Sequence, residues 1–263
     1  MEIKLEKVGA GFTNEYLKDI DLSFSNNEWC FFIGETGSGK STLLQTIAYL
    51  TKIFSGKLTF NGKELKDKST LREFRDKVGV MFQYTEKQFF CNSVKEEITY
   101  TLKRNKVSDD EIEKKLERVL ELLSFPREIL SNSPFEISGG QKRFTALASI
   151  LINEPKILIL DEPTAGLDIQ NKRIFYSVLE RLKKSGIMII QSSHTLEDVL
   201  KYGERVIKLE KGRVVKDGNP KKILLEERSE STDIFRILSK KGMDLSEINS
   251  IEELCEVMLS EEI

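Results

Sequence analysis

The chain has 263 residues, and its 41 lysine and arginine residues nearly balance its 43 aspartate and glutamate residues, which leaves a formal net charge of -2. With 39% hydrophobic and 32% charged residues, the composition is that of a globular protein with one large domain, alone or with a small appendage. A protein whose main partner is nucleic acid usually has a basic excess or a basic stripe, and this sequence has neither.

The three cysteines, Cys30, Cys91 and Cys255, lie far apart and are odd in number, so they form neither a disulfide framework nor a metal-binding box. Buried reduced thiols are the simplest interpretation, and they suit a cytosolic protein. No apolar run approaches the roughly 18 residues that a membrane-spanning helix needs, and the first residues do not resemble a signal peptide. We therefore expect this protein to meet a membrane only as a peripheral subunit.

Strands and turns are predicted for the first 65 residues. Residues 20–24 alternate apolar and polar, as in a half-buried strand, and residues 57–60 lead into the turn signal Asn61-Gly62. Residues 29–33 are apolar throughout, which is typical of a buried strand in a parallel sheet. A region rich in strands is therefore expected before the helical part of the chain.

Helices and further strands are predicted for the rest of the chain. Residues 108–111 form a capping-box pattern that starts a helix, and Pro126 and Pro134 interrupt the helical pattern after it. Two apolar runs, 156–160 and 187–190, predict buried strands with a helix between them. Strand–helix–strand repetition favours an α/β fold in which helices cover a parallel sheet.

The character of the chain changes near residue 218. A closing hairpin is predicted over residues 206–215. Asn219-Pro220 then combines a helix N-cap with a proline at the first helical position. We therefore predict one domain over residues 1–218 and a stretch of short helices over residues 219–263.

The stretch Gly34–Thr42 fits the pattern of a nucleotide phosphate loop, with a buried strand before it and a helical segment after it. Its glycines let successive backbone N–H groups turn inward, and the positive end of the next helix adds to their attraction for phosphate. Lys40 supplies a positive charge between the β- and γ-phosphates, and the hydroxyl of Ser41 is placed to ligate Mg²⁺. The whole predicted loop is Gly34, Glu35, Thr36, Gly37, Ser38, Gly39, Lys40, Ser41 and Thr42.

Two acidic residues, Asp161 and Glu162, follow the predicted strand at 156–160. Asp161 would hold Mg²⁺ directly or through water, and Glu162 would polarise the attacking water as a general base or as an orienting acceptor. Alone, they could be two solvated acids at a strand end, but the phosphate loop favours the catalytic interpretation. The only histidine, His194, follows the strand at 187–190, at the edge where ligands bind in open α/β sheets, and there it can reach the γ-phosphate.

A second anion site is predicted at Ser138, Gly139, Gly140 and Gln141, because two glycines open a helix there. One chain does not need two phosphate-binding helix starts for a single nucleotide. The economical hypothesis is that this helix start serves a nucleotide held by another subunit, although a merely flexible helix start would carry the same residues.

In order and spacing, residues 1–218 resemble the ABC ATPase family. The matching motifs are the Walker A loop at Gly34–Thr42, the Q-loop at Gln83, the signature motif at Ile137–Gln141, Walker B at Leu158–Glu162, the D-loop at Ala165–Asp168 and the H-loop at His194. In addition, Phe12 stands where the family usually has an aromatic residue that stacks on adenine. Six motifs in the family's order are far more specific than any one of them.

The resemblance implies a P-loop NTPase fold with a RecA-like α/β core, an antiparallel β region and a helical subdomain near residues 84–150. It also implies two cassettes packed head to tail with two ATPs between them. The residues that would act on the chain's own Mg-ATP are Lys40, Gln83, Glu162 and His194 in catalysis and Ser41, Gln83 and Asp161 at the metal. Ser138, Gly139 and Gly140 would close over the partner's ATP, and Gln141 and Asp168 are also implied to contact nucleotide.

A narrower resemblance is to the ATPases of energy-coupling factor (ECF) transporters. It rests on residues 82–90, on residues 93–98 and on the tail from 234 to 259, which looks like the short extension that helps hold two such ATPases together. These transporters import vitamins and transition-metal ions, and they pair two ATPases with a membrane coupling subunit and a substrate-binding membrane subunit. An acidic residue on the helix after the Q-loop there meets an arginine of the coupling subunit, and Glu97 and Glu96 are the candidates here.

The sequence departs from the family pattern at three positions. Ile137 replaces the usual leucine, Phe12 stands in place of tyrosine, and Phe144 stands where many members carry arginine. The last change removes a charge from the signature helix and puts its contact with the core in doubt. None of these changes removes a catalytic group, so the chain's own Walker site is expected to be active.

The function predicted from these resemblances is that of the ATP-hydrolysing subunit of an ECF-type importer, bound at the cytoplasmic face of the cell membrane. The alternatives are the ATPase of a binding-protein-dependent importer, a soluble non-transport ABC ATPase of DNA repair or chromosome maintenance, and an ABC-like scaffold. The DNA-repair class carries long insertions between Walker A and the signature motif, for which the gap between Thr42 and Ile137 has no room. An intact Glu162 and His194 disfavour the scaffold. Pairing with an identical chain and pairing with a relative both stay open.

Overall fold

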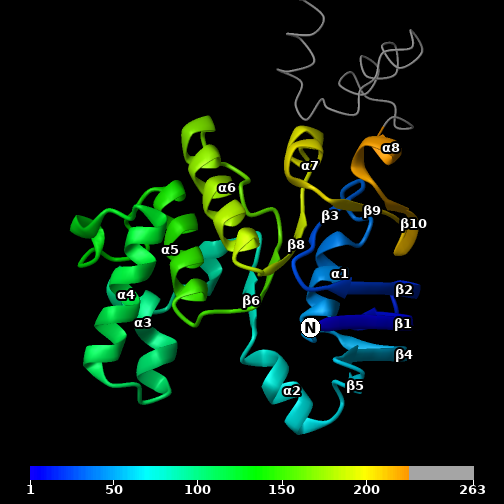
Figure 1. Cartoon of the computed structure of the whole chain (residues 1–263), viewed down its shortest axis with the longest axis horizontal. Coiled ribbons are helices and arrows are strands. Elements are labelled where there is room, and N and C mark those ends of the chain that lie inside the picture. Colours follow the sequence, from blue (N-terminus) through cyan, green and yellow to red (C-terminus); the bar gives the residue numbers. More distant parts are fainter. Residues whose placement is uncertain (225–263) are drawn as a thin grey trace, which may run out of the picture.

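The computed structural model describes residues 1–224, so the predicted helices of residues 219–263 lie outside the described part except for α8 (Pro220–Leu224). The described chain forms two β-sheets with helices between and beside them (Figure 1). The larger sheet has the strand order β10-β9-β3-β8-β7-β6, and the smaller one has the order β2-β1-β4-β5.

The six-stranded sheet is parallel except at one edge. Its strands are β3 (Trp29–Ile33), β6 (Val78–Met81), β7 (Ile157–Leu160), β8 (Met188–Ser192), β9 (Arg205–Glu210) and β10 (Arg213–Gly218). Strand β10 pairs antiparallel with β9, which confirms the predicted closing hairpin. The other pairs in this sheet are parallel, so the carboxyl ends of their strands meet at one edge.

Strand β3 lies inside this sheet and faces a core on each side. Trp29, Phe31 and Ile33 belong to one cluster of buried apolar side chains, whereas Cys30 and Phe32 belong to the other. Because successive side chains of a strand point to opposite faces, a strand that is covered on both faces must be apolar throughout. The loop that follows β3 therefore starts from a strand that is anchored on both sides.

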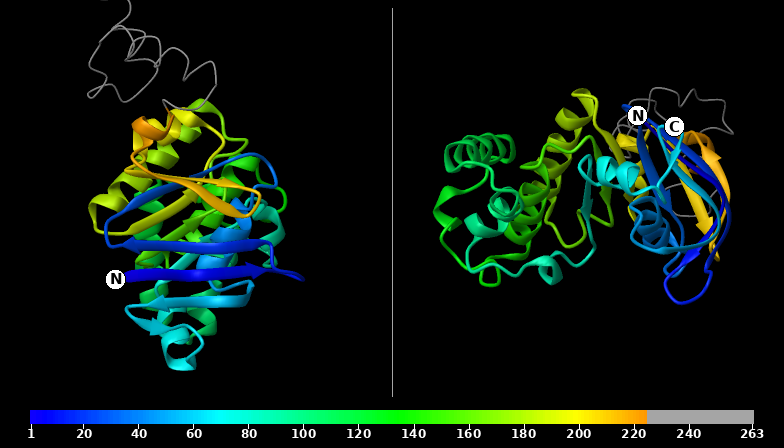
Figure 2. Two further views of the ribbon diagram at one scale, coloured as in Figure 1. Left: turned by 90° about the vertical axis from the view of Figure 1, so that its right-hand side faces the viewer. Right: turned by 90° about the horizontal axis from the view of Figure 1, so that it is seen from below.

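The four-stranded sheet is antiparallel and consists of β1 (Glu2–Gly11), β2 (Leu17–Ser25), β4 (Lys52–Phe60) and β5 (Lys63–Glu64). It packs on α1 (Lys40–Ile47), whose Leu43, Leu44 and Ile47 share a buried cluster with Ile3 and Leu5 of β1. The left view of Figure 2 shows these strands side by side. The predicted turn at Asn61-Gly62 is confirmed, because β4 and β5 pair directly across it.

Helices α5 (Gly139–Leu151), α6 (Ile169–Lys184) and α7 (Leu196–Tyr202) contribute to the core on the other face of the parallel sheet. Helices α3 (Val94–Arg104) and α4 (Asp109–Leu123) pack with α5 farther from the sheets (Figure 1). Helix α4 begins after Ser108, whose side chain accepts a hydrogen bond from the N–H of Glu111, as the capping pattern predicts. Shorter elements are α2 (Lys68–Arg75) and the 3-10 turns Thr85–Gln88 and Arg127–Ile129. None of the helices within residues 1–224 has the length and apolar character that crossing a bilayer requires.

Candidate functional site

Four loops meet at the carboxyl edge of the parallel sheet. They follow β3, β6, β7 and β8, and they carry the phosphate-loop sequence, Gln83, the pair Asp161-Glu162 and His194. A cavity of about 500 Å³ opens there, where ligands bind in open α/β sheets. Its lining consists of Phe12, Thr13, Asn14, Tyr16, Thr36, Gly37, Gly39, Lys40, Ser41, Thr42, Gln83, Glu162 and His194.

The phosphate loop connects β3 to α1 through backbone conformations that favour glycine. Gly34, Gly37 and Gly39 have φ angles of 140°, 80° and 110°. A Cβ atom on Gly34 would lie only 2.3 Å from the carbonyl oxygen of Leu209, so a side chain is excluded there by contact as well as by conformation. The glycine spacing that the sequence pattern requires therefore has a structural reason in this chain.

Lys40 lies at the end of this loop with its side chain buried. Its Nζ donates hydrogen bonds to the carbonyl oxygens of Gly34 and Glu35 at 2.7 and 3.0 Å. Burial lowers the pKa of the ammonium, and the nearby carboxylates of Glu162 and Asp161 oppose that shift. A positive charge is thus held against the wall of the cavity by neutral acceptors of its own loop.

Side chains from two other loops converge on the carboxylate of Glu162. Gln83 Nε2 donates to Glu162 Oε2 at 3.0 Å, and His194 Nε2 lies 2.6 Å from Glu162 Oε1. The structure therefore brings together Gln83, Glu162 and His194, which lie far apart in the sequence and were predicted from separate motifs.

The backbone of Glu162 is held by two residues that the sequence analysis did not select. Its N–H donates to Ser192 Oγ at 2.8 Å, and the hydroxyl of Ser192 donates to Asp161 Oδ1 at 2.7 Å. Arg143 Nη1 donates to the carbonyl oxygen of Glu162 at 3.3 Å. The only sequence signal for Ser192 is that it lies two residues before His194.

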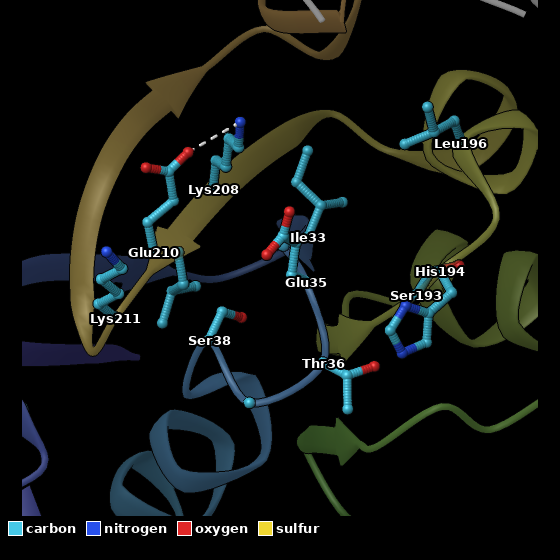
Figure 3. A pocket seen from close by; sticks show the side chains of 13 residues that line it. Ile33, Glu35, Thr36, Ser38, Ser193, His194, Leu196, Lys208, Glu210 and Lys211 are labelled. Carbon is cyan, nitrogen blue, oxygen red and sulfur yellow. Dashed lines mark ion pairs between the residues drawn. The ribbon is translucent and has the colours of Figure 1, made fainter. Parts of the chain in front are cut away.

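A second cavity, of about 530 Å³, is lined by another part of the phosphate loop (Figure 3). Thr36 and His194 lie on one side of it, and Lys208 and Glu210, which form an ion pair at 3.0 Å, lie on the other. Ser38 Oγ is buried and has no hydrogen-bond partner within the described residues. Thr36, Gly37 and His194 line both cavities.

The helix start at Ser138, Gly139, Gly140 and Gln141 does not line the cavity that contains Glu162. Ser138 caps α5: its Oγ accepts from the N–H of Gln141 at 3.2 Å, and its own N–H donates to Gln141 Oε1 at 2.9 Å. No atom lies within 4 Å of a Cβ built on Gly139, so this helix start is open to approach from outside.

Two residues near this helix start hold α5 and α6 in place. Asp168 caps α6, with its Oδ1 accepting from the N–H of Asn171 at 2.8 Å, so Asp168 also lies outside the cavity. Phe144 packs its ring against Phe175 of α6 with the centroids 5.7 Å apart. The phenylalanine that departs from the family pattern therefore makes an apolar contact with α6.

Glu97, expected to face a membrane partner, is instead buried. It is 7% exposed, and its Oε2 accepts hydrogen bonds from the N–H groups of Phe90 and Cys91 at 3.0 and 2.9 Å. The sequence pattern missed this because it places Glu97 on a helix without showing that the preceding segment folds back over it. Glu96 is exposed, and of the two candidates it is the one available at the surface.

Comparison with known proteins agrees with this geometry. The sequence profile described as ABC transporter matches residues 17–165. The energy-coupling factor transporter ATP-binding protein EcfA2 of Caldanaerobacter subterraneus subsp. tengcongensis is 37% identical, over 98% of this chain and 97% of that relative. The protein of the same name from Acetivibrio thermocellus is 42% identical, over 78% of this chain and 73% of its own length.

Solved structures show the same fold. The structure of cbiO1 from Clostridium perfringens, described as part of the ABC transporter complex cbiONQ, has a TM-score of 0.77 at 30% identity and covers 90% of this chain and 94% of its own. The dimeric bacterial ABC transporter cassette MJ0796 has a TM-score of 0.75 at 26% identity and covers 83% of this chain and 98% of its own. The chain therefore belongs to the ABC transporter family, among the ATP-binding proteins of energy-coupling factor transporters.

Proposed function

We propose that this chain binds and hydrolyses ATP as one of two paired ATPase subunits of an ECF-type importer. The observation that carries the proposal is the cavity in which the phosphate loop, Gln83, Glu162 and His194 meet. A loop that cradles phosphates, a carboxylate that can orient water and a histidine beside that carboxylate are the groups that nucleotide hydrolysis needs.

ATP would lie along the phosphate loop with its base toward Phe12. The Phe12 side chain is 60% exposed and lines the cavity, so its ring is free to stack on adenine. Lys40 would exchange its two loop carbonyl acceptors for phosphate oxygens. That exchange replaces neutral acceptors with charged ones, which form stronger hydrogen bonds with an ammonium group.

Glu162 would orient and polarise the attacking water, with Gln83 and His194 holding its carboxylate. His194 and Glu162 are within hydrogen-bond distance of each other. Entry of the γ-phosphate and water between these residues would have to separate them. The pair therefore offers a direct way for the chain to register that the γ-phosphate is present.

The donors at this site also fit Mg²⁺. The hydroxyl of Ser41, the side-chain oxygen of Gln83 and the carboxylate of Asp161 are all oxygen ligands, which this ion prefers. Asp161 is buried beside the cavity and is held by Ser192 at one oxygen. Bound Mg²⁺ would neutralise charge on the phosphates during transfer.

Pairing with a second cassette would complete each site. Ser138, Gly139, Gly140 and Gln141 lie away from the chain's own cavity on an open helix start, which is what a contact with another subunit's ATP requires. Asp168 would contribute from the adjoining loop. We propose that residues 219–263 help hold the two subunits together.

A membrane coupling subunit would contact the region around α3. Tyr84, Phe90 and Tyr100 are large aromatic side chains that remain exposed there, and Phe90 and Tyr100 pack edge to face with their centroids 4.6 Å apart. Glu96 lies on the same helix and would provide the acidic contact. We propose that the subunit works at the cytoplasmic face of the cell membrane, with a vitamin or a transition-metal ion as the transported substrate.

The proposal is tested by affinity capture of this chain from gently solubilised native membranes, followed by mass identification of the captured proteins. Capture of a second ABC ATPase together with a membrane coupling subunit is the expected result. Recovery with DNA-processing proteins, or as a homodimer without membrane proteins, would overturn the transport assignment. Because the captured substrate-binding subunit differs from one transporter to another, its identity would also indicate the substrate.

A further inference from the structure

We propose that Ser192 is a positioning residue for ATP hydrolysis, whose hydroxyl fixes the Asp161–Glu162 pair in its working orientation. The inference rests on the proposed function, because it concerns the same cavity. Ser192 is the last residue of β8 and is completely buried. Its hydroxyl therefore meets no solvent, and its hydrogen bonds must all be made within the protein.

Ser192 reaches the acidic pair because of the strand register. Leu160 of β7 pairs with Gln191 of β8 in parallel, so the next residues, Asp161 and Ser192, emerge together at the edge of the sheet. On its other side, Ser192 pairs with Phe32 of β3. A side chain fixed between two neighbouring strands can act as a rigid reference for the loop that follows β7.

The single hydroxyl of Ser192 serves both acids at once. It accepts a hydrogen bond from the N–H of Glu162 at 2.8 Å and donates its proton to Asp161 Oδ1 at 2.7 Å. The bond to the carboxylate is charge-assisted and is the stronger kind. This arrangement occupies one carboxylate oxygen of Asp161 and thereby sets which way the other oxygen faces.

The backbone of Glu162 needs such a restraint. Its φ angle of 47° lies in the left-handed region, which is disfavoured for every residue except glycine. Its carbonyl oxygen accepts from Arg143 at 3.3 Å and from the N–H of Ala165 at 3.1 Å, and its N–H donates to Ser192. Removing the Ser192 hydroxyl would leave the Glu162 N–H without this acceptor, and a shift of the peptide before Glu162 would move the carboxylate relative to Gln83.

Two substitutions isolate the hydroxyl from every other property of the side chain. Ser192→Thr and Ser192→Val have the same shape and both favour a strand, but only threonine keeps the hydroxyl. The two variants are compared in the full-length chain, assembled with its transporter partners. Three quantities are measured: kcat for ATP hydrolysis, KM for ATP, and the affinity for a fluorescent ATP analogue.

We expect kcat of Ser192→Val to fall about 10- to 100-fold below that of Ser192→Thr, because a small misplacement of a reacting group has an effect of this size. The affinity for the analogue should differ between the two by less than about threefold. Ser177→Ala is the control for the loss of a partly buried hydroxyl, since Ser177 Oγ donates to the carbonyl oxygen of Ile174 in α6 and neither residue lines the cavity. Its kcat should equal that of the wild type.

Equal kcat values for the threonine and valine variants would overturn the inference. So would a loss of analogue binding as large as the loss of kcat in Ser192→Val, because that result indicates general disruption. If the extra methyl group prevents folding, Ser192→Ala is compared with the wild type under the same criteria. Glu162→Gln is measured in the same assay. A wild-type rate in Glu162→Gln would contradict the proposed function. An inactive Glu162→Gln together with equal kcat values for Ser192→Thr and Ser192→Val would contradict only the role of Ser192.

Discussion

Replacing Glu97 should destabilise the isolated chain, because this residue holds the segment before α3 in place. One carboxylate oxygen of Glu97 accepts hydrogen bonds from the N–H groups of Phe90 and Cys91 at 3.0 and 2.9 Å, and Glu97 is only 7% exposed. A hydrogen bond to a charged group contributes about 1.5–3 kcal/mol, and two bonds that share one oxygen are not additive. We therefore expect Glu97→Ala to lower the free energy of unfolding by about 3 kcal/mol.

The expected change is large enough to measure by thermal unfolding. For a chain of this size, 1 kcal/mol corresponds to roughly 2–4 °C, so Glu97→Ala should lower Tm by roughly 6–12 °C. Glu97→Gln keeps an acceptor oxygen and loses only the charge, so its Tm should fall between those of Glu97→Ala and the wild type. Glu96→Gln is the matched control, because Glu96 lies on the same turn but is exposed, and its effect should stay within about 0.5 kcal/mol.

The same variants separate a structural role from a contact with a partner. If Glu97→Ala unfolds at the wild-type temperature but fails to assemble with membrane subunits, the residue acts at the surface and our reasoning from its burial is wrong. If Glu96→Gln is stable but assembles poorly, the acidic contact belongs to Glu96, as proposed above.

Two further predictions concern aromatic side chains. Phe12→Ala should weaken ATP binding by about 1–3 kcal/mol, which is the usual contribution of stacking on a base. It should not lower Tm, because the ring is 60% exposed. A titration with a fluorescent ATP analogue measures the loss of affinity, and an unchanged affinity would argue against stacking. Phe144→Ala should destabilise the chain by about 3 kcal/mol, because the ring is only 8% exposed. This value is near the low end for a phenylalanine truncation, because the ring borders a hollow of about 300 Å³ into which its surroundings can relax. Urea unfolding measures this change, and a loss below about 1 kcal/mol would show that the contact with Phe175 contributes little.

Much of the fold was predictable because its signals are local. The apolar run 29–33 could be recognised as a strand covered on both faces, and Ser108 and Asn61-Gly62 mark a helix start and a turn that the structure confirms. The phosphate loop was equally accessible, since its glycine spacing follows from backbone conformations that the loop itself requires.

The residues that escaped prediction depend on contacts between distant segments. Nothing in the sequence around Ser192 indicates its role, because only the register of β7 and β8 places it beside Asp161. The sequence places Glu97 on a helix but does not show that the segment containing Phe90 turns back and donates a hydrogen bond to its carboxylate. Neither relation has a signature in the sequence, because each is fixed by how separate elements pack.

The central claim is that this chain hydrolyses ATP at the cavity where Lys40, Glu162 and His194 meet. The most direct test is the rate of phosphate release from ATP by the chain assembled with its transporter partners, compared between the wild type and Glu162→Gln. We predict that Glu162→Gln binds ATP as tightly as the wild type but loses at least about 100-fold in rate, the usual contribution of a general base. An unchanged rate in Glu162→Gln would contradict the account.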